Sequence, residues 1–471
     1  LWHVADPAEP AKPPRGVRYP AAGTANAKID LFIISRDGSP TRVNATSEYI
    51  IAAGWDEHGP YAAAQSRDQR SVRFLAIDPA TGHTKTLTET HDERWVQLVP
   101  GSPTRTRSGA IVAHADENGT RYLTVGGSKV TPEGLQLAAV LSVDGDDVLF
   151  AASDDPLSKH LWLYRHGQPL QKLATGAGIG RSGVCVVTQQ RRVEVLREGR
   201  PAVMVKCLSQ RPVLSPRVTH LVLGARELRA ALYLPSWHHS HKLPVLVSPY
   251  GGLSRQLVTA ETSWPGLVAQ WFAEHGFAVL VADGRGTPGR GPEWERAVHG
   301  DLFGAVLEDQ VTALREAARL VPDLDLDRVG IRGWSFGGAV AMAAVLRHPD
   351  VFHAAVAGAG PTDQRLYNTH WRERTLGHPD EFPERYEQSS LLRAAPNLSR
   401  PLLLMHGLAD TNVFPLHTLR MSQALLAAGR PHETLLLPGI GHAAIGFPAT
   451  EGLLQHQLQF LTRHLEIEVR K

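Results

Sequence analysis

Gly333-Trp334-Ser335-Phe336-Gly337-Gly338 places a serine among small residues at the junction of two apolar runs. Residues 328–332 before it alternate as a short strand does, and residues 339–346 after it are typical of a buried helix. The glycines let the backbone bend sharply, so we expect the Ser335 hydroxyl to project from the turn while the helix N-terminus faces any negative charge that develops there. The stretch therefore predicts a nucleophile elbow, and the alternative is a glycine-rich turn with an incidental serine.

Two later loops offer an acid and a base for this serine. In the α/β-hydrolase fold the three groups follow one another in the order Ser, acid, His, each in a loop after a strand. The apolar run 401–405 predicts a buried parallel strand, and Asp410 lies in the loop that follows it. A helix and another strand are predicted between 416 and 438, and His442 lies in the next loop. This order predicts His442 as the base that takes the Ser335 proton, with Asp410 orienting the imidazole.

Other acids and histidines compete for these roles, because the chain contains 23 histidines. His406 opens the same loop as Asp410 but precedes it, so we interpret His406 as a structural residue with local hydrogen bonds. Asp363 and Asp380 do not directly follow a buried strand. Position in the chain therefore favours Asp410 as the acid.

An acyl-transfer site also needs hydrogen-bond donors for an oxyanion. The backbone N–H of Phe336, the residue after the serine, is one such donor. A predicted strand over 243–248 leads into Pro249-Tyr250-Gly251-Gly252, where lipases carry a His-Gly-Gly-Gly loop. The Tyr250 hydroxyl would supply the second donor, and the alternative is a tyrosine packed over a glycine turn.

Five motifs in a fixed order extend the comparison to a known family. They are Pro249-Tyr250-Gly251-Gly252, Asp283-Gly284-Arg285-Gly286-Thr287, Gly333-Trp334-Ser335-Phe336-Gly337-Gly338, His406-Gly407-Leu408-Ala409-Asp410-Thr411-Asn412-Val413 and Gly441-His442. In this order they resemble the catalytic domain of the prolyl oligopeptidase family of serine peptidases, and especially its dipeptidyl-peptidase-IV-like branch. The resemblance spans residues 219–465.

The resemblance implies roles for individual residues. Ser335, Asp410 and His442 would be the triad, Tyr250 an oxyanion donor, and Asn412 a residue that holds a substrate carbonyl. A hydrophobic pocket suited to proline or alanine would be lined by Phe336, Tyr367, Trp371 and Val413. The chain departs from the branch at two pocket positions, where Gln364 replaces a usual tryptophan and Trp371 a usual tyrosine. These departures bear on the preference for proline and not on peptide hydrolysis.

Composition excludes several other classes of protein. The chain has 49 basic and 47 acidic side chains and 42% hydrophobic residues, a balance that argues against nucleic-acid and membrane partners. No apolar run approaches the ~20 residues that cross a bilayer, and residues 1–18 lack a signal pattern, which favours a cytoplasmic location. The two cysteines are predicted to be buried free thiols. Residues 284–289 match the dinucleotide-binding pattern G-x-G-x-x-G, but they lie in a long loop and do not open a helix. We predict no cofactor and no metal.

The N-terminal part has a different texture, with short β-rich runs separated by Asp, Gly and Asn turns. Runs that begin at residues 31, 72, 121, 160 and 193 are separated by 33 to 49 residues, close to the ~40–50 of a propeller blade. We therefore predict part of a β-propeller over 1–215 and an α/β-hydrolase domain over 216–471, with the active site between them. A sandwich of hairpins is the alternative for the first part. Because the family's members carry more blades and the chain does not begin with methionine, we expect Leu1 to be an internal residue of a longer protein.

The predicted function is that of a serine peptidase acting on short peptides, with cleavage after proline or alanine. Aminopeptidases of the branch use a Glu-Glu pair to hold the substrate's amino group, and this chain contains no Glu-Glu dipeptide. Release of N-terminal dipeptides is therefore an expectation from the family alone, and a homodimer is left open. An esterase or acylaminoacyl-type hydrolase is the alternative among enzymes. A catalytically inert, propeller-based binding protein is the alternative of another class.

Overall fold

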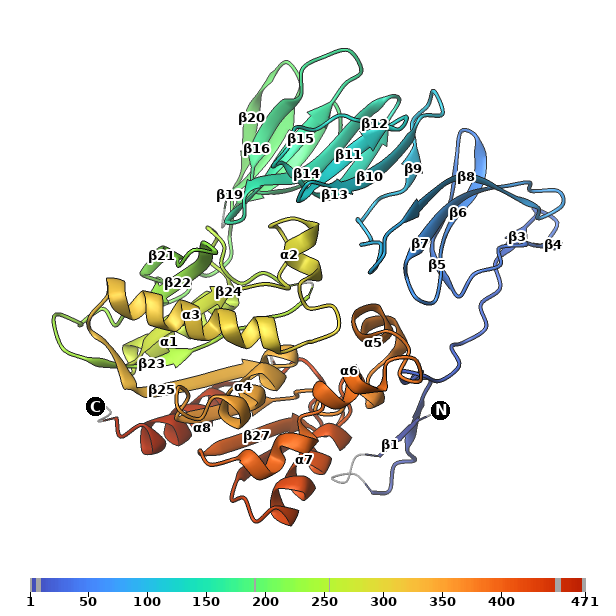
Figure 1. Cartoon of the computed structure of the whole chain (residues 1–471). Coiled ribbons are helices and arrows are strands. Elements are labelled where there is room, and N and C mark those ends of the chain that lie inside the picture. Colours follow the sequence, from blue (N-terminus) through green and yellow to red (C-terminus); the bar gives the residue numbers. More distant parts are fainter. Residues whose placement is uncertain (1, 6–9, 190–191, 254, 445–449, 468–471) are drawn as a thin grey trace.

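The chain folds into a series of antiparallel sheets followed by a layered α/β part, which lie at the top and the bottom of Figure 1. The computed structural model describes residues 2–5, 10–189, 192–253, 255–444 and 450–467. Among the described residues, the helices all begin after residue 263, as the contrast in sequence texture predicts.

Four sheets of four strands follow one another in the described part of the N-terminal half. The first contains β5 (Tyr49–Asp56), β6 (Gly59–Gln65), β7 (Ser71–Ile77) and β8 (Thr84–His91). The second contains β9 (Thr104–Arg105), β10 (Ile111–Glu117), β11 (Thr120–Val125) and β12 (Ser128–Lys129). The third contains β13 (Gln136–Asp144), β14 (Asp147–Asp155), β15 (Ser158–Tyr164) and β16 (Gln171–Thr175). The fourth contains β17 (Ala177–Arg181), β18 (Val184–Gln189), β19 (Arg192–Arg197) and β20 (Arg200–Val205).

The predicted repeat corresponds to one strand from each sheet. The runs that begin at 72, 121, 160 and 193 are β7, β11, β15 and β19, each the third strand of its sheet. The run at 31 is β3 (Phe32–Ile34), which pairs with β4 (Pro40–Arg42) in a two-stranded sheet. Most of these third strands are apolar because they are among the more buried strands of their sheets, as the patterns of β7 and β11 show.

The segment before β3 contacts the α/β part. Its strands β1 (Trp2–Val4) and β2 (Arg15–Val17) form a small hairpin, and Ala21 makes a β-bridge to Asn368 in the α/β part. The Ala22 N–H donates to the Tyr367 carbonyl at 2.9 Å, and the Ala22 side chain joins the core of the α/β part. Small apolar side chains at 21 and 22 allow this close approach, so the segment packs on the α/β part.

An eight-stranded sheet forms the centre of the α/β part. Its spatial order is β21 (Val218–Leu223), β22 (Leu228–Tyr233), β24 (Ala278–Asp283), β23 (Leu243–Val247), β25 (Leu324–Trp334), β26 (Ala354–Gly358), β27 (Leu402–Gly407) and β28 (Glu433–Leu437). The strands from β24 to β28 are parallel, and β21 and β22 extend the edge in antiparallel pairing. The buried parallel strands carry nearly continuous apolar runs because helices cover both faces.

The helices divide between the two faces of this sheet. One face packs against α3 (Gly304–Leu320), α4 (Phe336–Arg347) and α7 (Leu416–Ala427), and the other packs against α1 (Trp264–Glu274) and α8 (Thr450–His464). Short elements in the loops are α2 (Pro292–Arg296), η1 (Gln364–Leu366), α5 (Thr369–Leu376), α6 (Pro383–Gln388) and η2 (Leu392–Asn397). An α/β fold places its site beyond the C-terminal ends of the parallel strands.

Some bounds differ from the prediction. Strand β25 begins four residues before the predicted 328–332 run and reaches Trp334, and α4 begins directly after Ser335. The predicted boundary at 215/216 lies between β20 and β21 and stays a prediction. Cys185 is buried as expected, whereas Cys207 is exposed, because it lies in the linker between the two parts.

Buried ion pairs join the two parts. Arg121 of β11 contacts Glu295 of α2 at 3.0 Å, and Arg296 of α2 contacts Asp116 of β10 at 2.7 Å. On α5, Glu373 accepts hydrogen bonds from Arg67 at 2.8 Å. Helix α5 is therefore anchored by side chains of the sheet-rich part.

Candidate active site

The serine lies on a strained turn between β25 and α4. Ser335 has φ of 60° and ψ of −124°, a left-handed backbone that side chains rarely adopt. The glycines around it are needed because a Cβ at Gly333 would lie 2.1 Å from the Gly337 carbonyl oxygen, and one at Gly337 would lie 2.6 Å from the Pro249 carbonyl oxygen. The predicted sharp strand-to-helix turn is confirmed.

The three residues predicted as a triad are brought together by three separate loops. His442 Nε2 lies 2.9 Å from Ser335 Oγ, and His442 Nδ1 lies 2.7 Å from Asp410 Oδ2. The Trp334 indole N–H donates to the His442 carbonyl oxygen at 2.7 Å and ties the histidine loop to the elbow. This arrangement allows a proton to pass from the hydroxyl to the imidazole, with the carboxylate fixing the imidazole's tautomer.

The carboxylate of Asp410 is buried but well provided with donors. Asp410 Oδ1 accepts hydrogen bonds from the backbone N–H groups of Asn412 at 2.8 Å and Val413 at 3.0 Å. Burial alone would raise the pKa of Asp410, but hydrogen bonds from His406 and His442 outweigh it and lower the pKa to about 2. Asp410 is thus ionised at neutral pH, as an orienting acid requires.

His406 has the local hydrogen bonds expected of a structural residue. Its side chain is fully buried, with Nδ1 2.7 Å from the Thr418 hydroxyl and Nε2 2.8 Å from the Val413 carbonyl oxygen. Nε2 also lies 3.4 Å from Asp410 Oδ2. His406 therefore supports the acid loop, and Ser335 is contacted by His442.

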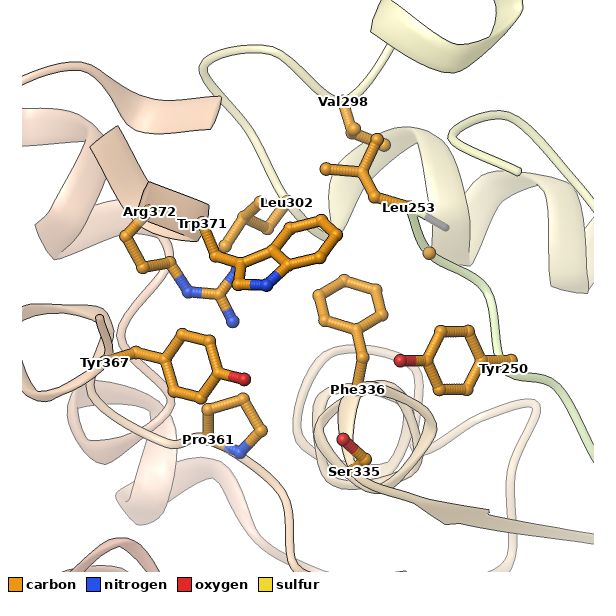
Figure 2. A pocket seen from close by; sticks show the side chains of 11 residues that line it. Tyr250, Leu253, Val298, Leu302, Ser335, Phe336, Pro361, Tyr367, Trp371 and Arg372 are labelled. Carbon is orange, nitrogen blue, oxygen red and sulfur yellow. The ribbon is translucent and has the colours of Figure 1, made fainter. Parts of the chain in front are cut away.

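The two predicted oxyanion donors flank the serine. Phe336 is the first residue of α4, so its backbone N–H lies at a helix N-terminus, where partial positive charge is concentrated. Figure 2 shows the Tyr250 hydroxyl directed toward the elbow that carries Ser335 and Phe336. Both Tyr250 and Ser335 line the same two cavities.

The smaller cavity lies directly beside Ser335 and has a volume of about 60 Å³ (Figure 2). Three predicted residues, Phe336, Tyr367 and Trp371, form its aromatic wall, and Phe336 stacks on Phe303 at 5.7 Å between ring centroids. Its other side chains are those of Tyr250, Leu253, Val298, Leu302, Pro361 and Arg372. A cavity this small fits a compact side chain.

Two expectations about this cavity are corrected. Val413 lines neither cavity, because its side chain is fully buried behind the Asp410 loop that its backbone supports. Gln364 also points away from the cavity, since its Nε2 donates to the carbonyls of Pro361 and Ser389 at 3.3 Å. The charged residue in the wall is Arg372, for which the sequence offers no signal.

A second, wider cavity of about 450 Å³ extends from Ser335 and His442 along α1 and α8. Asn412 lines it, and the Asn412 side-chain carbonyl accepts a hydrogen bond from the Tyr367 hydroxyl at 3.3 Å. Arg332 also lines it, donating to Gln457 at 3.1 Å and Ser248 at 3.3 Å. This cavity is large enough for the parts of a peptide on both sides of the reacting bond. We predicted an active site between the two parts, but the lining residues of both cavities come from the α/β part. The sheet-rich part contributes to the site only by contacting helix α5.

The sheet and the Ser335–His442–Asp410 arrangement are those of the α/β-hydrolase fold, and a sheet-rich part precedes them in the chain. The description "Prolyl oligopeptidase family" matches residues 264–468, and "Dipeptidyl peptidase IV (DPP IV) N-terminal region" matches residues 1–172. The α/β part is therefore similar to the prolyl oligopeptidase family, and the part before it is similar to the N-terminal region of dipeptidyl peptidase IV. The propeller prediction is thereby confirmed and the sandwich alternative is wrong.

Individual relatives agree with this placement. Human dipeptidyl peptidase 8 is 34% identical over 230 residues, which are 48% of this chain and 25% of that protein. Human prolyl endopeptidase FAP is 27% identical over 285 residues, 57% of this chain and 37% of that protein. The crystal structure of Porphyromonas gingivalis dipeptidyl peptidase 4 superimposes with a TM-score of 0.89 at 22% identity, over 98% of this chain and 71% of the other. The chain therefore spans well under half the length of these curated relatives.

One further property of the described residues concerns membranes. Among them, no helix combines the length and the apolar character that a bilayer crossing requires.

Proposed function

We propose that this protein is a serine peptidase that hydrolyses short peptides through an acyl-enzyme. The observation that carries the proposal is the hydrogen-bonded chain from Ser335 through His442 to Asp410, with donor-acceptor distances of 2.9 and 2.7 Å. The names of the relatives, dipeptidyl peptidase and prolyl endopeptidase, support a peptide as the substrate.

The first half of the reaction forms the acyl-enzyme. His442 Nε2 takes the Ser335 proton as Oγ attacks the carbonyl carbon before the scissile bond. The negative charge that develops on the carbonyl oxygen is stabilised by the Phe336 N–H and the Tyr250 hydroxyl. His442 then passes the proton to the leaving amine, and the new N-terminus departs. In the second half, water is activated by the same histidine and releases the acyl group.

The pocket sets the residue before the scissile bond. A volume of about 60 Å³ bounded by the rings of Phe336, Tyr367 and Trp371 favours a compact side chain. We propose proline and alanine, since the flat proline ring fills an aromatic box without the rotamer entropy that a longer side chain loses. Asn412, which lines the wider cavity, would hold a carbonyl of the substrate on the acyl side. We also propose that the protein releases N-terminal dipeptides. The support for this part of the proposal is the name dipeptidyl peptidase that the relatives carry.

The experiment separates an enzyme from an inert scaffold and a peptidase from an esterase. A fluorophosphonate probe should label the wild-type protein, and Ser335→Ala should abolish both labelling and hydrolysis while the circular dichroism spectrum is retained. Loss of a triad member typically lowers kcat by ~10⁴- to 10⁶-fold. Retention of a tenth of the wild-type turnover would exclude Ser335 as the nucleophile. Hydrolysis of p-nitrophenyl esters without any cleavage of dipeptide anilides would favour the esterase.

A further inference from the structure

Arg372 brings a positive charge into the wall of the small pocket beside Ser335. The side chain comes from α5, is 5% exposed, and is among the residues that line the pocket. Figure 2 shows its guanidinium above the ring of Tyr367, and the distance to the ring centroid is 4.6 Å. A pocket whose other lining side chains are uncharged therefore contains a cation.

This cation has no anionic partner among the residues that the structure describes. The groups with the largest electrostatic effect on Arg372 are tyrosine hydroxyls and not carboxylates, and its buried Nε has no hydrogen-bond partner in the described part of the chain. The neighbouring tyrosine does not supply the missing charge, because burial raises the pKa of Tyr367 and keeps its hydroxyl neutral. Burial lowers the pKa of Arg372, but an arginine remains protonated at neutral pH. The pocket wall thus carries about one uncompensated positive charge.

The neighbouring charges on α5 are treated differently. Glu373 accepts two hydrogen bonds from Arg67 and one from the Gly23 N–H. Arg374 donates to the Gln69 side chain at 2.7 Å. The side chains of both neighbours are therefore hydrogen-bonded to residues of the sheet-rich part. Of the three residues, Arg372 is the one that lines the pocket. A buried charged donor that is left unpaired is destabilising, so a ligand that supplies an acceptor would gain from this arrangement.

We propose that the pocket binds an acidic side chain, aspartate, immediately before the scissile bond, with Arg372 as the specificity-determining residue. This inference rests on the proposed peptidase function and adds a substrate class to it. Aspartate has the shortest carboxylate side chain, which suits a volume of about 60 Å³. The surrounding rings and aliphatic side chains exclude water, which strengthens a charge-assisted hydrogen bond between carboxylate and guanidinium. Proline and alanine remain substrates because they fit the same volume.

The test compares nearly isosteric side chains. We would measure kcat/KM for the p-nitroanilides of Ala-Asp, Ala-Asn and Ala-Leu, with Ala-Pro and Ala-Ala as references. We expect Ala-Asp to exceed Ala-Asn and Ala-Leu by roughly 10- to 100-fold, the range for a hydrogen bond to a charged group. Arg372→Met should bring the Asp-to-Asn ratio to one or below, whereas Arg372→Lys should keep part of it. Arg365→Met is the matched control, because Arg365 also stacks on a tyrosine, at 5.4 Å from the Tyr386 ring, but lies outside the pocket.

Each outcome has a defined meaning. If Ala-Pro is cleaved but wild-type protein does not distinguish Ala-Asp from Ala-Asn, the inference is overturned and the peptidase proposal stands. This comparison needs no variant, so misfolding of Arg372→Met does not remove it. If no anilide is cleaved, the peptidase proposal fails, and calorimetry of Ser335→Ala protein with the dipeptides Ala-Asp and Ala-Asn then decides. Tighter binding of Ala-Asp would support the acidic pocket, and equal binding would overturn it.

Discussion

Ser335 is held in a conformation that its own backbone disfavours. A non-glycine residue at a φ of 60° costs of the order of 1–3 kcal/mol, and the surrounding hydrogen bonds maintain it. The Ser335 N–H donates to the Gly358 carbonyl at 2.9 Å, and the Ser335 carbonyl accepts from the Ala339 N–H at 3.1 Å. The strain therefore fixes the direction of the hydroxyl before any substrate arrives.

The role of Tyr250 is tested by removing one oxygen atom. Tyr250→Phe should lower kcat by ~10²–10³-fold and change KM little, because an oxyanion donor acts mainly in the transition state. Steady-state kinetics on Ala-Pro-p-nitroanilide measures both constants. A change in KM with kcat intact would mean that Tyr250 is a packing residue over the glycine turn.

The pH dependence of kcat/KM tests the histidine. Because the pKa of Asp410 is lowered to about 2, its carboxylate stays ionised across the range in which histidines titrate. Because a general base must be neutral to accept a proton, we expect the rate to fall on the acid side without a contribution from Asp410. A rate that does not vary over this range would require a base other than His442.

At the scale of elements, α5 connects the sheet-rich part to the pocket. It carries Trp371 and Arg372 on the pocket side, while Glu373 and Arg374 are bonded to Arg67 and Gln69 of the propeller. The pocket wall is thus positioned by contacts that the α/β part does not itself supply.

A single and a double substitution test this connection. Arg67→Met leaves the Glu373 carboxylate buried without its cation and should destabilise the protein by about 1–3 kcal/mol while raising KM. Adding Glu373→Gln removes the unpaired charge, so the double variant should be more stable than Arg67→Met alone. Urea unfolding and steady-state kinetics give the two readouts. Equal stability of the single and double variants would show that Arg67 is not needed to neutralise Glu373.

The sequence predicted some of these elements well and others not at all. Strand β27, helix α7 and strand β28 follow from apolar runs and their spacing, and the loops after these strands contain Asp410 and His442. Arg372 was missed because its neighbours in space, such as Tyr250, come from distant loops, and a buried cation has no local sequence signature. Val413 was misplaced because a likeness to a family fixes its position in the chain but not the direction of its side chain.

At the scale of the whole molecule, partly or fully buried histidines link stability to pH. Burial lowers the pKa of His114, His299 and His370 to about 4 and that of His417 to about 3. Two of them face the propeller, since His299 lies 6.1 Å from the Trp95 ring and His370 lies 5.2 Å from the Tyr49 ring. In the unfolded chain a histidine binds its proton near pH 6.5.

The sign of the effect follows from proton linkage. Between pH 6.5 and about 4 the unfolded chain binds more protons than the folded protein, so stability is full above pH 6.5 and declines as the pH falls. The urea midpoint should therefore be nearly constant above pH 6.5 and drop between pH 6.5 and pH 4.5. His417→Asn, at a fully buried position, should reduce this slope. A midpoint that is constant over the same range would contradict the neutral state of these histidines.

The hairpin segment before β3 gives the protein an unusual order of assembly during synthesis. The Tyr19 hydroxyl donates to the Asn412 carbonyl at 3.0 Å and accepts from the Asn368 N–H, which comes 349 residues later in the chain. At ~5–20 residues per second, the ribosome makes that partner roughly 20 to 70 s after Tyr19. Trp2, which stacks on Phe414 at 4.6 Å between ring centroids, waits longer still. During this interval the segment has been synthesised but the residues that it binds have not. Its contacts with Tyr367 and Asn412 therefore form only after the propeller strands and most of the α/β part have been synthesised.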